Sequence, residues 1–457
     1  MGSFTEFLDK RLSTPMAKLA EQRHLRAIRD GIIATLPLII VGSFFLIIAN
    51  PPLPESWGIY KTLKANAATI VLPYRMTMYI MTIYACWGIG YSLAKSYKLD
   101  GVTGGTLSAA AFLLTLVPKS VAALTPELME IVNGNPDLLK WYQGVPQGLQ
   151  MPMANMGGGG MFVGILVSIL AVEIFRFTNK SGFKISMPEQ VPPSVARSFE
   201  ALTPAAIIIL LIGSITYYAN FDWHGFIAKL VAPLVSATDT LPSVWILVIL
   251  TDFFWSFGIH GASIVGSIAR PVWLMLLDKN QVALAAGDAL PAIAAEPFFQ
   301  WFIYIGGSGC TIGLAIVLLL FAKSSYGKQL SRTAIIPSIF NINEPIIFGA
   351  PVVLNPTLII PFIIAPLITG TVAWFATSMG LVSRVIVTAP WTLPGPIGAF
   401  MATNDWRAAV LNIICILISI VIYYPFVKMY DNKLLKEEKG ETEFNDKVLN
   451  DGKGQTV

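Results

Sequence analysis

The sequence predicts an all-α membrane protein that crosses the bilayer many times. Hydrophobic residues make up 54% of the 457 residues and charged residues only 13%, against about 25% charged in a typical soluble domain. Apolar runs of about 20 residues, long enough to span a bilayer, recur along the chain. These runs do not alternate as β-barrel strands do. We therefore expect about ten transmembrane helices and, in addition, re-entrant hairpins.

The predicted spans share an apolar composition with few or no charges. They are Ile28–Ala49, Ile70–Leu93, Met161–Phe177, Leu202–Ala219, Val244–Ile264, Phe298–Ala322, Thr357–Gly380 and Ala408–Val427, with a shorter candidate at Gly104–Val117. Clusters of lysine and arginine precede the first span and follow several others. The positive-inside rule therefore predicts cytosolic N- and C-termini, with Thr125–Gln147 outside. This assignment requires the chain to cross or fold back once more between Ile264 and Phe298.

Four regions follow from this pattern. Residues 1–27 are expected to form a cytosolic amphipathic helix, because apolar residues recur there at helical spacing opposite basic ones. Such a helix lies on the membrane surface or packs against the protein's own cytosolic loops. Residues 28–235 and 236–430 form an N-terminal and a C-terminal membrane half, and residues 431–457 form a polar cytosolic tail. Charges persist through Asp30, so the start of the chain is not a signal peptide.

Several classes of function find no support. Cys86, Cys310 and Cys415 all lie within apolar runs, and the three histidines are far apart, so we expect no disulfide framework, metal site or cofactor. The net charge of +4 reflects the positive-inside bias and does not indicate a nucleic-acid partner. The glycine-rich run Met156–Met161 lacks the features of a nucleotide loop. We interpret it as a tight turn that lets helices approach closely.

Two segments are too short and too rich in proline for straight spans. They are Ile335–Pro351 and Val385–Phe400, and we predict that each forms a re-entrant hairpin. Broken helices at membrane depth are tolerated where their freed backbone groups line a cavity or are buried in protein. Paired interrupted segments are also a sequence sign of a transporter binding site.

Glu344 is the main candidate for such a site. It is the only ionisable residue between Arg332 and Arg384, and a carboxylate at membrane depth costs about 2.5–3.5 kcal/mol on insertion scales. Asn341 and Asn343 precede it, and together they offer the donors and acceptors that suit a polyhydroxylated ligand. The alternative is a glutamate that is satisfied within a helix junction.

His260 is the second candidate. We predict that it extends a polar stripe with Asp252 and Ser256 along one helix, Val244–Ile264. Gly258 and Gly261 on either side would let a ligand or another backbone approach the imidazole. The alternative is a core histidine that is bonded to a carbonyl.

Aromatic residues give weaker signals. Trp391 lies in the second interrupted segment, where its indole either stacks against a sugar ring or anchors the chain at the membrane interface. For Trp255 we favour core packing. We expect His224 to lie in a loop.

Two motifs then match a known family. Asn343-Glu344-Pro345 within a proline-rich C-terminal half, preceded by Gly258-Ile259-His260-Gly261, resembles enzyme IIC, the membrane permease component of the bacterial sugar phosphotransferase system. The resemblance covers nearly the whole chain and is strongest for the lactose/cellobiose/diacetylchitobiose group.

The resemblance implies specific roles. It assigns His260 and Glu344 to hydrogen bonds with the sugar, with support from Asn343, in a protein of the bacterial cell membrane. It also implies a homodimer formed through the N-terminal half, elevator-type movement of the C-terminal half, and IIB and IIA phosphocarrier partners. Some lactose-type relatives continue into a IIB domain with a phosphocysteine, whereas residues 431–457 contain no cysteine. We therefore expect separate IIB and IIA proteins and no phosphoryl-accepting residue in this chain.

The sequence leaves two other function classes open. In a proton-coupled secondary sugar transporter, Glu344 would exchange a proton while His260 responds. A membrane glycosyl-transferring enzyme would need an acidic metal motif. The acidic residues that could supply one are too scattered, namely Asp239, Asp278, Asp288 and Glu296. Which disaccharide is bound is not evident from the sequence.

Overall fold

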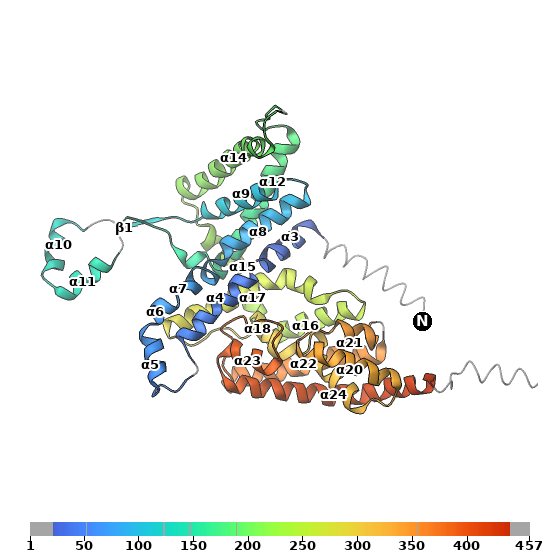
Figure 1. The fold of residues 1–457 in the computed structure, drawn as a ribbon. Helices are drawn as coiled ribbons and strands as arrows, with labels where there is room; N and C mark the ends of the chain where they lie inside the picture. The colour runs from blue at the N-terminus through green and yellow to red at the C-terminus, as the bar shows by residue number, and fades with distance from the viewer. Residues whose placement is uncertain are drawn as a thin grey trace, which may run out of the picture. The chain divides into compact units, whose positions relative to one another are not determined.

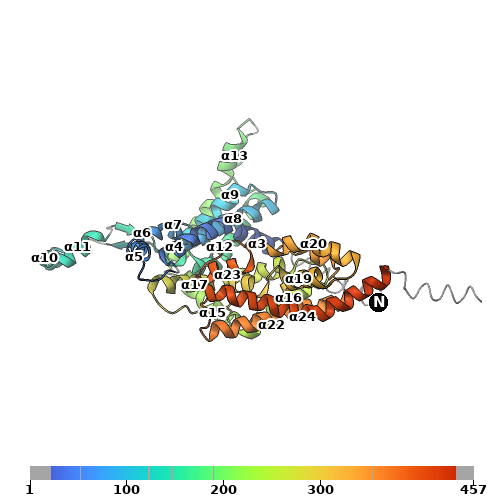
Figure 2. The same cartoon turned by 60° about the horizontal axis from the view of Figure 1, so that its bottom comes forward.

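The computed structural model describes residues 22–51, 53–121, 124–145, 148–188, 190–353 and 355–438. These residues are mostly helical, with two short strands (Figures 1 and 2). Five helical segments are long and apolar enough to cross a membrane, and up to seven if each of two bent helix pairs is one span. They are Arg23–Ala49, Gly158–Ser181, Val195–Tyr218, Pro356–Ser378 and Trp406–Glu438. The predicted helical membrane class is confirmed, whereas the predicted number of crossings stays a prediction.

The chain groups into two compact units. Unit 1 comprises Met1–Arg29, Leu36–Met78 and Val231–Val457, and unit 2 comprises Asp30–Thr35 and Tyr79–Leu230. The segment Leu36–Met78 thus groups with the C-terminal helices. The division into a scaffold half and a transport half stays a prediction. Of the predicted helix 1–27, residues 1–21 lie outside the described part of the chain.

Unit 2 is built on three closely packed helices, α8 (Met81–Ser96), α9 (Gly101–Leu113) and α12 (Met161–Ser181). A methyl group added at Gly104 would overlap Ala94 on the neighbouring helix, so glycine sets the distance between α8 and α9. Unit 2 also contains α10 (Pro126–Asn133), α11 (Pro136–Gly144), α13 (Pro193–Glu200), α14 (Leu202–Gly213) and the π-helix η5 (Ser214–Tyr218).

Short elements connect these helices. Strands β1 (Lys119–Val121) and β2 (Gly148–Gln150) pair antiparallel, with Lys119 opposite Gln150. The glycine-rich run forms the 3₁₀ turn η4 (Gly158–Gly160) after η3 (Met153–Asn155). A methyl group at Gly160 would overlap the carbonyl oxygen of Asn155, in agreement with the predicted tight turn.

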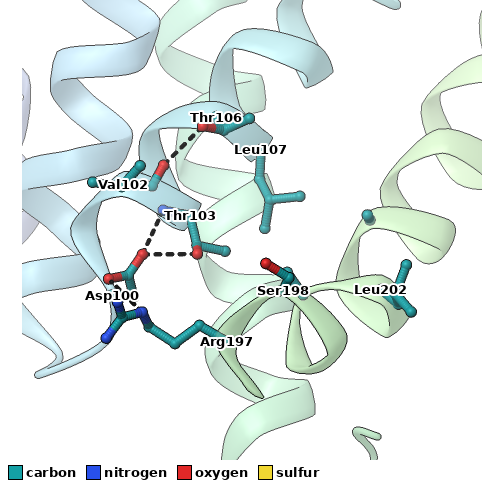
Figure 3. Close-up of a pocket in the computed structure, with 10 residues that line it drawn as sticks. Asp100, Val102, Thr103, Thr106, Leu107, Arg197, Ser198 and Leu202 are labelled. Atoms are coloured by element: carbon teal, nitrogen blue, oxygen red, sulfur yellow. Dashed lines mark hydrogen bonds and ion pairs between the residues drawn. The ribbon is translucent and has the colours of Figure 1, made fainter. Parts of the chain in front are cut away.

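The start of α9 is fixed by a side-chain cap (Figure 3). Asp100 Oδ2 accepts hydrogen bonds from the Thr103 backbone N–H and from its hydroxyl, both at 2.8 Å. The Arg197 guanidinium of α13 lies 3.7 Å from Asp100 Oδ1. The cap therefore also links α9 to α13.

Unit 1 begins with a run of short helices. The chain forms α3 (Arg23–Ile33, whose end belongs to unit 2), α4 (Leu36–Ala49), α5 (Gly58–Ala65), α6 (Ala67–Ile70), α7 (Leu72–Arg75) and η2 (Met78–Ile80). The predicted single span Ile70–Leu93 is wrong, because the chain breaks twice before α8 begins at Met81. Pro73 starts a new helical turn in α7, and the Thr77 hydroxyl bonds the Pro73 carbonyl.

The rest of unit 1 contains long helices separated by irregular segments. They are α15 (Trp223–Thr238, whose start belongs to unit 2), α16 (Leu241–Ser256), α17 (Gly261–Ala286), α18 (Glu296–Phe298), the π-helix η6 (Phe299–Ile303), η7 (Ser308–Cys310), α19 (Ile312–Phe321), α20 (Ser325–Ile339), α21 (Glu344–Gly349), α22 (Pro356–Ser378), α23 (Gly395–Thr403) and α24 (Trp406–Glu438). Helix α24 continues past residue 431, where the buried Asp431 accepts hydrogen bonds from the Lys323 and Ser324 backbone N–H groups.

Two further predicted spans are wrong as continuous helices. Val244–Ile264 breaks after Ser256, where Gly258 adopts a left-handed φ of +77°. Phe298–Ala322 breaks between η6 and α19, and its two helical parts meet at a 58° bend. In both cases glycines in the left-handed region end the helix. His224, predicted in a loop, lies in the first turn of α15.

Candidate functional site

Three interrupted segments of unit 1 meet where helical hydrogen bonding fails. The first is the turn after η6, where Gly306, Gly307 and Gly309 all have positive φ values. The second separates α20 from α21, and the third is the non-helical stretch that precedes α23. Freed backbone groups at such breaks need partners when they are buried.

Asn341 and Asn343 supply many of those partners. The Asn341 side chain accepts a hydrogen bond from the Gly306 N–H at 2.8 Å and donates to the carbonyls of Trp391 and Leu393 at 2.7 and 2.9 Å. Asn343 Nδ2 donates to the Ser308 carbonyl at 2.9 Å. Both residues are buried, and Asn341 itself adopts a left-handed φ of +62°. These two amides therefore join all three interrupted segments.

A second pair of buried amides lies on α17. Asn280 Nδ2 donates to the carbonyls of Ala292 and Val385 at 2.8 and 2.9 Å, and Gln281 Nε2 donates to the Ile386 carbonyl at 2.8 Å. Both side chains are fully buried. They supply hydrogen-bond donors to the backbone carbonyls at the start of the predicted interrupted segment Val385–Phe400. The interruptions predicted in this segment and in Ile335–Pro351 are present, while their re-entrant path stays a prediction.

His260 and Glu344 both lie at helix starts. His260 caps α17, with Nδ1 3.2 Å from the Ser263 N–H, and Glu344 is the first residue of α21. Both side chains are exposed, and the Glu344 carboxylate lies within electrostatic range of the imidazole. The Trp255 ring links His260 to α21, because its centroid lies 4.6 Å from the His260 ring and 6.4 Å from the Phe348 ring of α21.

The polar stripe predicted through His260 is not present. Asp252 and Ser256 are buried within α16, whereas His260 follows the break. Gly261 is needed because a methyl group there would overlap the Thr251 carbonyl. That glycine thus serves contact between α17 and α16 rather than access by a ligand. The buried Trp255 packs as predicted.

Trp391 lines a separate cavity of about 130 Å³ in the same unit. Arg270, Glu296, Gln300 and Thr388 also line it. Arg270 Nη2 lies 2.7 Å from Glu296 Oε1, while Glu296 Oε2 and Thr388 Oγ1 are buried without a hydrogen-bond partner. Because the Trp391 carbonyl is bonded by Asn341, this cavity adjoins the interrupted segments.

The predicted site residues thus fall into two groups. His260 and Glu344 lie close together with their side chains exposed, and Trp391 is half exposed beside the cavity. Asn341 has both donors engaged by backbone, whereas Asn343 Oδ1 has no partner within the described chain. Arg270, Gln300 and Thr388 were not singled out from the sequence, and Glu296 was considered only as one of several scattered acidic residues. An arginine and a glutamate within the ambiguous stretch Ile264–Phe298 were the available signal.

This arrangement offers hydrogen-bonding groups and an apolar face of the kinds that suit a polyhydroxylated ligand. A carboxylate, an imidazole, a free amide oxygen and the Trp391 indole supply acceptors, donors and an apolar face. Within the described parts of the chain, no three His, Cys, Asp or Glu side chains gather as metal ligands would.

Comparisons with known proteins identify the family. A family model described as "Phosphotransferase system, EIIC" matches residues 29–366. The lichenan permease IIC component of Bacillus subtilis (strain 168) is 38% identical, over 96% of each chain. The cellobiose-specific EIIC component of Geobacillus stearothermophilus is 37% identical, over 100% of this chain and 99% of its own. The crystal structure of ChbC, the IIC component from the N,N'-diacetylchitobiose-specific phosphotransferase system, aligns with a TM-score of 0.84 at 38% identity, covering 95% of this chain and 100% of that one.

Proposed function

Because the chain belongs to the phosphotransferase system EIIC family, we propose that it binds a β-linked disaccharide and moves it inward across the bacterial cell membrane. Its substrate is of the cellobiose or diacetylchitobiose type. The names of its relatives, which include a cellobiose-specific EIIC component and a diacetylchitobiose-specific IIC structure, support this class. A separate phospho-IIB, recharged by IIA, then phosphorylates the sugar.

His260, Glu344 and Asn343 bind the sugar hydroxyls directly. The observation that carries this proposal is that His260 and Glu344 stand at adjoining helix starts with exposed side chains. Asn343 Oδ1 adds a free acceptor beside Glu344. Asn341 contributes by fixing the Trp391 segment through its backbone hydrogen bonds, and the Trp391 indole stacks against a sugar ring.

The cavity beside Trp391 supports a transport cycle with more than one state. Its volume of about 130 Å³ is below the roughly 300–1,000 Å³ of usual ligand pockets. A whole disaccharide therefore requires the surrounding helices to move apart. We propose elevator-type displacement of the C-terminal half within a homodimer, with both termini in the cytosol.

The test is binding of radiolabelled cellobiose and diacetylchitobiose to purified protein. Glu344→Gln and His260→Ala should each weaken binding by about tenfold or more, because each removes a charge-assisted or buried hydrogen bond to the ligand. Glu130→Gln, at an exposed position of α10, is the matched control and should bind as the wild type does. Unchanged affinity in either site variant would remove that residue from the site.

Transport in sealed vesicles tests the mechanism. Without IIA and IIB, the proposed permease should equilibrate sugar without accumulating it. Uphill accumulation driven by a pH gradient alone would instead establish the proton-coupled transporter, which family membership disfavours.

A further inference from the structure

Unit 2 contains a cavity that the proposed transport site does not use. Its volume is about 460 Å³, within the usual range of roughly 300–1,000 Å³ for ligand pockets. Most of the polar and aromatic side chains around it come from β1, from η3, and from the segment that leads into the first turn of α15. Six of the lining residues are Lys119, Asn155, Asn220, Phe221, Asp222 and His224.

The backbone beside this cavity departs from regular geometry. The π-helix η5 spans Ser214–Tyr218, and π-helical turns are frequent at functional sites. Asn220 follows with a left-handed φ of +51°, a conformation that asparagine adopts more readily than other residues with side chains. This path presents the Asn220 and Asp222 side chains at the cavity.

His224 has a hydrogen-bonding pattern that fixes its tautomer. The Thr115 hydroxyl donates its one proton to the Phe112 carbonyl at 2.7 Å, so it can only accept from His224 Nε2, 3.1 Å away. In the neutral ring, Nδ1 is therefore an acceptor, and it is buried without a partner. A buried acceptor without a partner costs about 1–3 kcal/mol, and a ligand hydroxyl recovers that energy when the ring turns its Nδ1 edge toward the cavity.

The other lining groups also suit hydroxyls. Asn155 and Asn220 make no side-chain hydrogen bond within the described chain, so each carboxamide offers both donors and an acceptor. Asp222 Oδ1 accepts from the Gly225 N–H at 2.9 Å, which leaves Oδ2 for a ligand. The Phe221 ring, packed edge to face on Trp223 at 5.1 Å, supplies a flat apolar face. Amides, a carboxylate and an aromatic face together match a carbohydrate better than an inorganic anion.

We propose that this cavity is an accessory sugar site that holds a second β-linked disaccharide. The inference rests on the proposed function for the substrate class and adds a binding site in unit 2. In the proposed orientation, the cavity lies at the outer end of α9 and receives sugar from outside the cell.

Equilibrium dialysis with radiolabelled cellobiose, up to millimolar concentration, tests the site in full-length protein. Wild type should bind two equivalents, and Glu344→Gln should keep one at its wild-type affinity while the other weakens by about tenfold or more. The double variants Glu344→Gln/Asn155→Ala and Glu344→Gln/Asp222→Asn should lose the remaining equivalent. In Asp222→Asn the side-chain oxygen can still accept the hydrogen bond from the Gly225 N–H. Adding Asp137→Asn to Glu344→Gln, at an exposed position of α11, should leave that equivalent in place.

The outcomes separate this inference from the proposed function. One equivalent in wild type and none in Glu344→Gln would overturn the accessory site while supporting the transport site. Binding that survives Glu344→Gln at full stoichiometry but falls by one equivalent with Asp222→Asn would support the accessory site alone. Displacement of the second equivalent by inorganic phosphate would overturn hydroxyl recognition.

Discussion

The packed helices of unit 2 and the interrupted segments of unit 1 use glycine for opposite purposes. In α8 and α9, Gly90 and Gly104 lie inside regular helices, and the missing side chains let two backbones approach. In the turn after η6, Gly306 and Gly307 have φ values of +76° and +103°, which bring the helix to an end. The first use preserves the helical hydrogen bonds, and the second releases backbone groups from them.

The difference shows how each region meets its hydrogen-bonding needs. Helices α8, α9 and α12 satisfy their own backbone and can be covered by apolar side chains or lipid. The interrupted segments depend on the amides of Asn280, Gln281, Asn341 and Asn343, which reach across from other elements. A region that already needs polar side chains for its backbone can also present polar groups to a ligand. The scaffold and the site are thus distinguished by where backbone hydrogen bonds go.

The largest effect is expected at Asn341. Asn341→Gly would leave the Gly306 N–H and the Trp391 and Leu393 carbonyls without their partner, at about 1–3 kcal/mol for each buried group. We expect unfolding free energy to fall by about 3 kcal/mol or more. Asn341→Ala should lose about 1 kcal/mol further, because alanine is strained at a φ of +62°. The measurement is the thermal unfolding midpoint of the purified protein in detergent.

A control separates amide loss at a junction from amide loss in general. Asn66 Nδ2 donates to the Thr62 carbonyl on an exposed helix end, so Asn66→Ala should shift the midpoint much less. An Asn341→Gly midpoint equal to that of Asn66→Ala would show that the interrupted segments do not depend on this side chain.

The second prediction compares two glycines directly. Gly104→Ala places a methyl group against Ala94, and Gly307→Ala places one against the Asn343 amide. We expect each to lower stability by about 1–3 kcal/mol through overpacking, and Gly307→Ala to lose roughly 1–2 kcal/mol more because alanine is strained at a φ of +103°. Only Gly307→Ala should also weaken disaccharide binding, because it displaces the residue before Glu344. Stability and sugar affinity measured on both variants test this, and an equal loss of affinity in Gly104→Ala would contradict the contrast.

The sequence predicted the interruptions that proline marks and missed those that glycine alone makes. The breaks near α21 and α23 are indicated by Pro345, Pro390 and Pro394, because proline removes a backbone donor and restricts the conformation of the residue before it. Gly258 and Gly306 look like the small residues that transmembrane helices tolerate. Their positive φ values depend on tertiary neighbours, such as Ile312 packed against Gly306, and no local pattern encodes that contact.

The candidate site shows the same limit. Glu344 and His260 could be selected from the sequence because ionisable residues are rare in apolar segments. Other features depend on contacts between distant segments. Asn341 bonds the backbone of Gly306 and of Trp391, and Arg270 pairs with Glu296. Side-chain chemistry could therefore nominate polar residues, but only the fold separates those that support the backbone from those left free for a ligand.

The smallest predicted effect concerns the regular region. Asp100→Ala removes the cap of α9 and its link to Arg197, and loss of such a cap costs about 1 kcal/mol.

The hydrogen bond from the Thr103 N–H is the main cause that lowers the pKa of Asp100 below its ordinary value of 3.8. A lowered folded-state pKa means that this stabilisation is present above pH 3.8 and is lost as the pH falls through the folded-state pKa. Unfolding midpoints at neutral and acidic pH should therefore converge for wild type and Asp100→Ala as the pH falls, with sugar binding at neutral pH unchanged. A gap between the two proteins that stays constant with pH would show that the carboxylate charge plays no part in the cap.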